Sequence, residues 1–213
     1  MYLEKKKLTD MKKIMFNKPY GLEDAVIDGR KPITRRIVSE EIMAKAKAYQ
    51  WQYFAETNED LPLEDALLKF SPYKVGEVVA IAQAYKYVEP ELKTSGVKRV
   101  YNQSLDIYEH PLVLTPGWDN KMFVKAELMP NKIRISSVGV EFLQNISDED
   151  CLREGVLHSD KYAMPYGIQT PAGVFFYYST PREAFAALID KISGRFTWGS
   201  NPYVFVYEFE LVK

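Results

Sequence analysis

The chain contains very little cysteine and histidine. Its 213 residues include one cysteine, Cys151, and two histidines, His110 and His158. A single thiol cannot form an internal disulfide, which agrees with a reducing compartment, so we expect a cytoplasmic protein. These residues also lack the spacing of a zinc or iron site, and we expect neither a metal nor another cofactor.

Long apolar runs and a charge excess are absent too. No apolar run approaches the ~18–20 residues that cross a bilayer, and no apolar core of a signal peptide follows the early lysines. We therefore expect no membrane partner. The 28 basic and 29 acidic residues leave a net charge of −1. A non-specific nucleic-acid binder is expected to be basic overall, so any nucleic-acid contact should be a local pocket.

The start of the chain is a local exception to this charge balance. Its first 18 residues hold six lysines against two acidic residues. Charge runs of this kind are often disordered tails, so we interpret residues 1–13 as a basic, flexible terminus.

Aromatic residues, in contrast, are abundant, at 14% of the chain with 15 Tyr and 11 Phe. This favours a β-rich fold over a helical bundle. The length suits one domain with insertions, and we expect a single domain over residues 1–213.

Apolar periodicity and capping residues predict the elements. Expected helices cover residues 21–28, 39–54, 64–70, 147–155 and 180–194. Expected strands cover residues 15–19, 75–85, 132–142, 174–178 and 203–210. The clearest helix begins with Thr180 as N-cap, Pro181 at the first position and Glu183 at the third. Residues 37–70 are interpreted as an inserted helical segment.

Two segments resemble a known family. Asp28-Gly29-Arg30-Lys31-Pro32-Ile33-Thr34-Arg35-Arg36 is similar to the helix-then-GxKxxTxR signature of the ASCH (ASC-1 homology) family. Residues 198–209, WGSNPYVFVYEF, resemble the W-x-x-N-P-W-V-W-V-x-E-F ending of phage-type members. Smaller pieces lie between them in the expected order, so the resemblance extends from about Phe16 to the C-terminus. Pro32 departs from the pattern, because the family usually has threonine there.

The resemblance implies an α+β fold, a PUA-like β-barrel with flanking helices and a cleft lined by the GxKxxT motif. It also implies RNA binding. A small branch of the family hydrolyses the amide of N4-acetylcytidine with a lysine and a threonine of the motif and a later glutamate. The matching positions here are Lys31, Thr34 and Glu154.

The residue chemistry allows both a binding and a structural interpretation. Arg30, Lys31, Arg35 and Arg36 are four cations within seven residues. Such a cluster suits a phosphate or a developing oxyanion. Alternatively, these are surface cations that neutralise a helix C-terminus and nearby acids.

The three catalytic candidates have similar alternatives. Lys31, if desolvated among arginines, would have a lowered pKa and could take a proton from Thr34. Thr34 could instead be a turn residue bonded to its own backbone. Glu154 ends a helix, where the dipole would raise its pKa and suit it to acid–base work, or it is an exposed glutamate of no consequence.

Further ligand contacts are expected from aromatic and polar side chains. Trp118, Trp198 and Tyr203 could stack on a base, as in single-stranded RNA readers, or pack in the core. Asn201 could read a Watson–Crick edge or begin a turn, and Lys121 is a further candidate for ligand binding.

Three functions remain open. The first is binding of RNA or of a nucleoside or nucleotide in the basic cleft. The second is an amidohydrolase acting on N4-acylated cytidine, with ribonuclease activity less favoured. The third is a phage accessory protein that binds a phage or host protein through residues 37–70. The first two require Lys31, Thr34 and Glu154 to converge around a cavity that can hold a nucleobase.

Overall fold

The computed structural model describes residues 11–94, 100–104, 107–109 and 111–212. They form two compact units, which we describe separately. The first unit comprises residues 1–16, 78–134 and 211–213, and the second comprises residues 17–77 and 135–210. Most of the basic terminus and His110 lie outside the described residues, and the single domain stays a prediction.

The second unit holds most of the helices. They are α1 (Leu22–Ile27), α2 (Glu40–Thr57), α3 (Leu63–Lys69), α5 (Asp148–Arg153), α6 (Pro181–Ser193) and α7 (Thr197–Ser200). Its strands are β2 (Ile33–Ile37), β7 (Leu157–His158), β8 (Tyr166–Gln169), β9 (Phe175–Tyr178) and most of β6 (Lys132–Phe142) and β10 (Tyr203–Val212).

The first unit holds shorter elements. They are β1 (Lys13–Ile14), β3 (Val78–Ile81), α4 (Tyr85–Thr94), β4 (Val100–Asn102), β5 (Ile107–Glu109) and 3₁₀ turns at Pro116–Trp118, Lys121–Phe123 and Ala126–Leu128. Its core contains Tyr85, Leu92 and Met129, and Trp118 packs against it.

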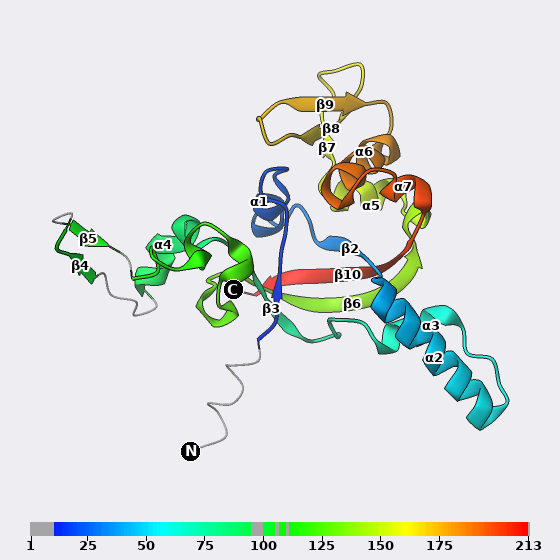
Figure 1. Ribbon diagram of the computed structural model, residues 1–213. Coiled ribbons are helices and arrows are strands. Elements are labelled where there is room, and N and C mark those ends of the chain that lie inside the picture. Colours follow the sequence, from blue (N-terminus) through cyan, green and yellow to red (C-terminus); the bar gives the residue numbers. More distant parts are fainter. Residues whose placement is uncertain (1–10, 95–99, 105–106, 110, 213) are drawn as a thin grey trace. The chain divides into compact units, whose positions relative to one another are not determined.

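The expected PUA-like β-barrel is wrong, although the α+β class holds. The described strands form an open mixed sheet in the order β1-β3-β6-β10-β2, a hairpin of β4 and β5, and a three-stranded sheet in the order β7-β8-β9 (Figure 1). A closed barrel needs its first and last strands to pair along their length. Here β1 has only two residues, and β7, β8 and β9 pair with one another instead.

The strand pair that carries the motif is β2 and β10. It is antiparallel, with Thr34 opposite Tyr207 and Arg36 opposite Phe205. The β-prone composition of residues 203–212 explains β10, which was predicted. Strand β2 was not predicted, because its two central arginines suggested an exposed turn.

Capping residues set the helix boundaries as expected. The Thr180 hydroxyl accepts a hydrogen bond from the Glu183 N–H, and Pro181 is the first residue of α6. In the same way, the Ser39 hydroxyl caps α2 at Ile42. These two predicted helices are therefore confirmed.

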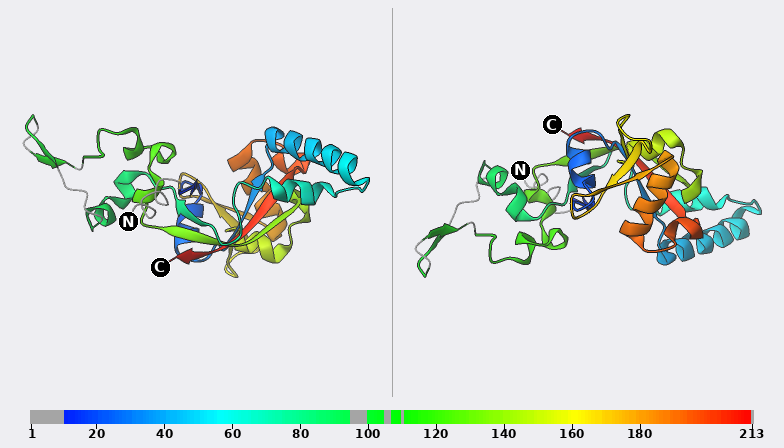
Figure 2. Two further views of the ribbon diagram at one scale, coloured as in Figure 1. Left: turned by 90° about the horizontal axis from the view of Figure 1, so that it is seen from below. Right: turned by 90° about the horizontal axis from the view of Figure 1, so that it is seen from above.

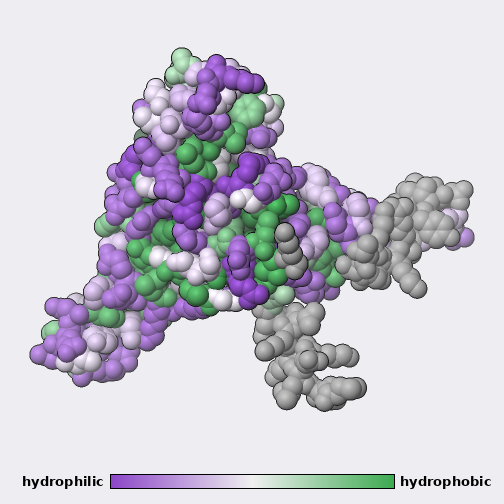
Figure 3. Space-filling model, turned by 180° about the vertical axis from the view of Figure 1, so that it is seen from behind, coloured by the Kyte–Doolittle hydropathy of each residue, from purple (hydrophilic) through white to green (hydrophobic). Residues whose placement is uncertain are grey.

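Helices α2 and α3 occupy the segment 37–70 and lie side by side (Figures 1 and 2). Of the 18 residues of α2, all of them described, only Ala46 is buried. Figure 3 shows this hairpin, at the lower left, as largely hydrophilic. None of the helices in the described part of the chain combines the length and apolar character needed to span a bilayer.

Candidate functional site

Lys31 and Glu154 meet inside the second unit, although 123 positions separate them in the sequence. Lys31 follows α1, and its backbone N–H donates to the Ala25 carbonyl at 2.9 Å. Its Nζ donates to the Glu154 carbonyl at 2.7 Å and forms an ion pair with the Glu154 carboxylate. Lys31 is 2% exposed and Glu154 is 4% exposed. The structure therefore brings these two predicted residues together as a buried pair.

Arg35 joins the same cluster from the middle of β2. Its guanidinium donates to the carboxylates of Glu141 at 2.7 Å and Asp150 at 2.8 Å, and approaches Glu154 at 3.5 Å. Three acidic side chains thus surround two buried cations. We refer to Lys31, Arg35, Glu141, Asp150 and Glu154 as the buried ionic cluster.

This charge balance changes the interpretation of the basic motif. A cation that is already paired with a carboxylate must lose that partner before it can bind a phosphate, and an uncompensated buried charge is costly. Lys31 and Arg35 therefore do not form a free phosphate site in this structure. They are better placed to hold the carboxylates in fixed positions.

Thr34 and Arg36 belong to the other face of β2. Successive residues of a strand point to opposite faces, and Arg35 points towards the acids. Thr34 is 4% exposed and lies opposite the fully buried Tyr207. Within the described part of the chain, the Thr34 hydroxyl hydrogen-bonds to neither Lys31 nor Glu154. The structure thus does not bring all three catalytic candidates into one hydrogen-bonded group.

The electrostatics of Lys31 follow from its burial. Removal from water lowers the pKa of the Lys31 ammonium, whereas the Glu154 carboxylate acts to raise it. The charges of Arg36 and Arg35 lower it further, and the net direction is downward. Lys31 is therefore easier to deprotonate than an exposed lysine.

Asp150 is held in its ionised form by two arginines. Its second carboxylate oxygen accepts from Arg153 at 2.8 Å. Burial acts to raise the pKa of Asp150, but the hydrogen bonds and charges of Arg35 and Arg153 outweigh it and hold the pKa below its ordinary value. A carboxyl whose pKa is lowered by folding stabilises the fold above its unfolded pKa, and this stabilisation is lost as the pH falls.

We therefore predict a specific acid sensitivity. Below about pH 4, the free energy of unfolding of the wild type should fall more steeply than that of Asp150→Asn. The asparagine side chain at position 150 does not take up a proton in this pH range. Urea titrations between pH 2 and 6 measure both slopes, and Asp28→Asn, at an exposed position, is the control. Parallel curves for the wild type and Asp150→Asn would show that the two arginines do not favour the charged carboxylate.

The other predicted ligand residues are dispersed. Arg30 is exposed and pairs with Asp28. Trp198 packs edge-on against Phe185 and lies near Arg182. The Asn201 side chain accepts a hydrogen bond from the Gln144 N–H at 2.8 Å. Trp118 and Lys121 lie in the first unit, where the Lys121 Nζ donates to the Phe16 carbonyl.

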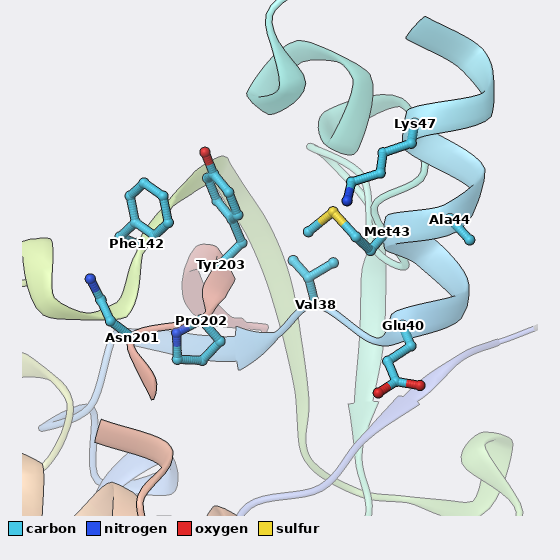
Figure 4. Close-up of a pocket in the computed structure, with 9 residues that line it drawn as sticks. All are labelled: Val38, Glu40, Met43, Ala44, Lys47, Phe142, Asn201, Pro202 and Tyr203. Carbon is cyan, nitrogen blue, oxygen red and sulfur yellow. The ribbon is translucent and has the colours of Figure 1, made fainter. Parts of the chain in front are cut away.

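Tyr203 and Asn201 line a separate pocket of about 530 Å³ in the second unit. Figure 4 shows Met43 and Lys47 of α2 facing Tyr203, whose ring stacks on Phe142. None of the cluster residues lines this pocket, and Arg35 lies opposite Val206, three residues from Tyr203 along β10, a separation of about 10 Å for an extended strand. The pocket is therefore displaced from the buried ionic cluster.

Two members of the cluster were missed as functional residues. Asp150 and Glu141 were expected only as parts of the helix over residues 147–155 and the strand over residues 132–142. A buried arginine and a buried lysine need acidic partners, so the acidic run 148–150 was the available signal.

Comparison with known proteins gives no independent support for a family. No family model, no curated protein and no solved structure matches the chain. The ASCH resemblance therefore rests on the sequence motifs alone.

Proposed function

We propose that the chain is a cytoplasmic ASCH-type protein that binds a nucleoside or a short single-stranded RNA segment in its second unit. The observation that carries the proposal is the buried contact between Lys31 and Glu154. Both residues match functional positions of the family. If the resemblance were due to chance, there would be no reason for two residues 123 positions apart to be in contact.

Lys31 and Arg35 are each paired with carboxylates, and this changes the way in which the ligand is expected to be recognised. Because their charges are balanced by acids, the ligand should be recognised by hydrogen bonds to its base or carbonyl rather than through its phosphates. Direct contact also leaves no room for a base between Lys31 and Glu154, so the ligand would bind beside the pair. Affinity should consequently fall only weakly with rising salt concentration.

Strand β2 is an outer strand of its sheet, and a ligand beside the pair would reach the Thr34 hydroxyl around this edge. Replacing Thr34 by valine tests that contact with little disturbance of the fold. The change keeps the volume and the β preference but removes the hydroxyl. Loss of one hydrogen bond should weaken ligand binding by about tenfold. Calorimetric titration with cytidine, N4-acetylcytidine and short RNA measures this effect. Thr57→Val, on the exposed end of α2, is the matched control.

Two outcomes of this titration would contradict the binding proposal. One is equal affinity of Thr34→Val and the wild type for every ligand that the wild type binds. The other is a wild-type protein that binds none of the ligands.

A second candidate is an amidohydrolase acting on N4-acylated cytidine. It is favoured by the lowered pKa of Lys31, which a buried lysine beside a carboxylate could use for proton transfer. Either a water molecule would attack the acyl carbon directly, or Thr34 would attack it and form an ester that water then hydrolyses. In both cases the C–N4 bond would break, N4 would take up a proton, and the acyl group would leave as a carboxylate. Lys31 would activate the nucleophile, and Glu154 would act as general acid–base.

This activity has a direct test. Glu154→Gln should abolish conversion of N4-acetylcytidine into cytidine and acetate, while circular dichroism shows an intact fold. Glu149→Gln, on the exposed side of α5, should react at the wild-type rate. Chromatography of the nucleosides measures both. Undiminished turnover by Glu154→Gln would remove Glu154 from the mechanism.

Binding of a phage or host protein by α2 and α3 is a third candidate. Trp51 is 76% exposed and Phe54 is 44% exposed on α2. Both line a pocket with Leu61, so the hairpin offers apolar surface to a partner.

A further inference from the structure

Strand β9 is the outer strand of the three-stranded sheet, and its own residues carry no charge. A charged neighbour is Lys191 of α6, whose Nζ lies 5.3 Å from the centre of the Phe176 ring. The sheet order is β7-β8-β9, and β9 pairs with β8 on one side only among the described strands (Figure 1). Residues 170–179, TPAGVFFYYS, include no Asp, Glu, Lys or Arg. Outer strands are usually protected against pairing with another chain by charged residues, bulges or prolines within the strand. Strand β9 contains neither a charged residue nor a proline.

The backbone groups on the open side of β9 can be identified from the register. The Thr170 N–H donates to the Val174 carbonyl at 2.9 Å, and Phe176 lies opposite Ile168. Hydrogen-bonding groups of an antiparallel strand alternate between its two sides. Those of Phe176 therefore face β8, whereas those of Phe175 and Tyr177 point outwards.

The side chains around this edge are apolar and exposed. Phe175 is 41% exposed and Phe176 is 49% exposed, and they point to opposite faces. Val174 is 55% exposed, and Tyr162, whose ring lies 4.5 Å from that of Tyr177, is 51% exposed. Helix α6 packs against one face of this sheet, but both phenylalanine side chains of β9 remain partly exposed. An apolar strand edge of this kind is suited to pairing with another strand.

We propose that β9 pairs antiparallel with β9 of a second copy of this chain, joining two three-stranded sheets into one of six strands. The occupant should be an uncharged, apolar strand, because Phe175 and Tyr177 contact aromatic rings and a charged residue opposite them would lose its hydration. Strand β9 itself meets this requirement.

A two-fold axis through Phe176 gives a self-complementary arrangement. It places Phe176 of one copy opposite Phe176 of the other. Phe175 of each copy then lies opposite Tyr177 of the other copy. Roughly four backbone hydrogen bonds would form between the outward groups of Phe175 and Tyr177. The facing aromatic pairs would add to these contacts.

The exposed area suits a weak dimer. Burying roughly half of five side chains of about 150–200 Å² each removes about 400–500 Å² per copy. The total of about 800–1,000 Å² lies at the lower limit for a specific interface, so we expect a dissociation constant of roughly 1–100 μM. The proposal does not depend on the nucleoside site.

Sedimentation velocity of the full chain over a wide concentration range tests the dimer. Phe176→Lys places two like charges opposite each other at the two-fold axis and should weaken dimerisation at least tenfold. Trp51→Lys changes a still more exposed aromatic residue, on α2, and should leave dimerisation unchanged. A monomer at all concentrations, open-ended aggregates, or a dimer lost only in Trp51→Lys would overturn the proposal.

Disulfide trapping tests the register independently of affinity. Phe176→Cys should form a cross-linked dimer on mild oxidation, because directly opposite residues without mutual hydrogen bonds lie close enough for a disulfide. Phe175→Cys faces Tyr177 and should cross-link much more slowly. The native Cys151 is buried and gives a low background. Equal cross-linking of the two variants would overturn the proposed register, and no cross-linking would overturn the interface.

Discussion

Replacing Arg35 by methionine is expected to lower the free energy of unfolding by about 3–5 kcal/mol. Methionine fills much of the same space but removes every hydrogen bond to Glu141, Asp150 and Glu154. Three carboxylates would then lie close together with one fewer cation between them. Urea denaturation at pH 7 measures the loss.

Arg30→Met is the matched control for this substitution. Arg30 belongs to the same motif but is exposed and pairs only with Asp28 in the described structure. An exposed ion pair contributes little, so the control should unfold at the wild-type urea concentration. Similar losses for the two variants would show that Arg35 is not a buried centre of charge compensation.

The Lys31→Met variant should lose a similar amount, about 3–5 kcal/mol, because the Glu154 carboxylate would lose its closest cation while its contact with Arg35 is long, at 3.5 Å. The double variant with Glu154→Gln should regain part of this free energy of unfolding, because the neutral amide of glutamine does not need a cation beside it. The expected double-mutant cycle is therefore strongly non-additive.

Lys45→Met provides the control for the loss of a lysine. Lys45 pairs with Glu41 on the exposed surface of α2, and its replacement should not change stability measurably. Additive effects of Lys31→Met and Glu154→Gln would contradict the direct contact between the two side chains.

Local signals in the sequence were enough to predict several elements. The helix α6 followed from Thr180, Pro181 and Glu183, which satisfy the first backbone N–H groups. The strand β6 followed from its alternating residues 132–142. Helix capping and strand alternation both act within a few positions of the chain. These elements could therefore be predicted without knowledge of tertiary contacts.

The sheet topology was not predictable in the same way. Strand β2 was missed because Arg35 and Arg36 suggested an exposed turn, whereas Arg35 is compensated by acids more than 100 positions away. The barrel expectation came from the family resemblance. The separate pairing of β7, β8 and β9 contradicts it, and strand pairing partners are not encoded in local periodicity.

The candidate site was predicted in part. Lys31 and Glu154 meet, but the alternation of β2 directs Thr34 to the face of Tyr207. Asn201 and Tyr203, which were predicted as ligand residues, line another pocket together with residues of α2.

A titration of the ¹⁵N-labelled protein with cytidine and N4-acetylcytidine tests the central claim most directly. If a nucleoside binds beside the buried ionic cluster, amide resonances of Lys31, Arg35 and Glu154 should shift with a common saturation curve. Shifts confined to α2 and α3, or no shift at millimolar ligand, would contradict a nucleoside site built on Lys31 and Glu154.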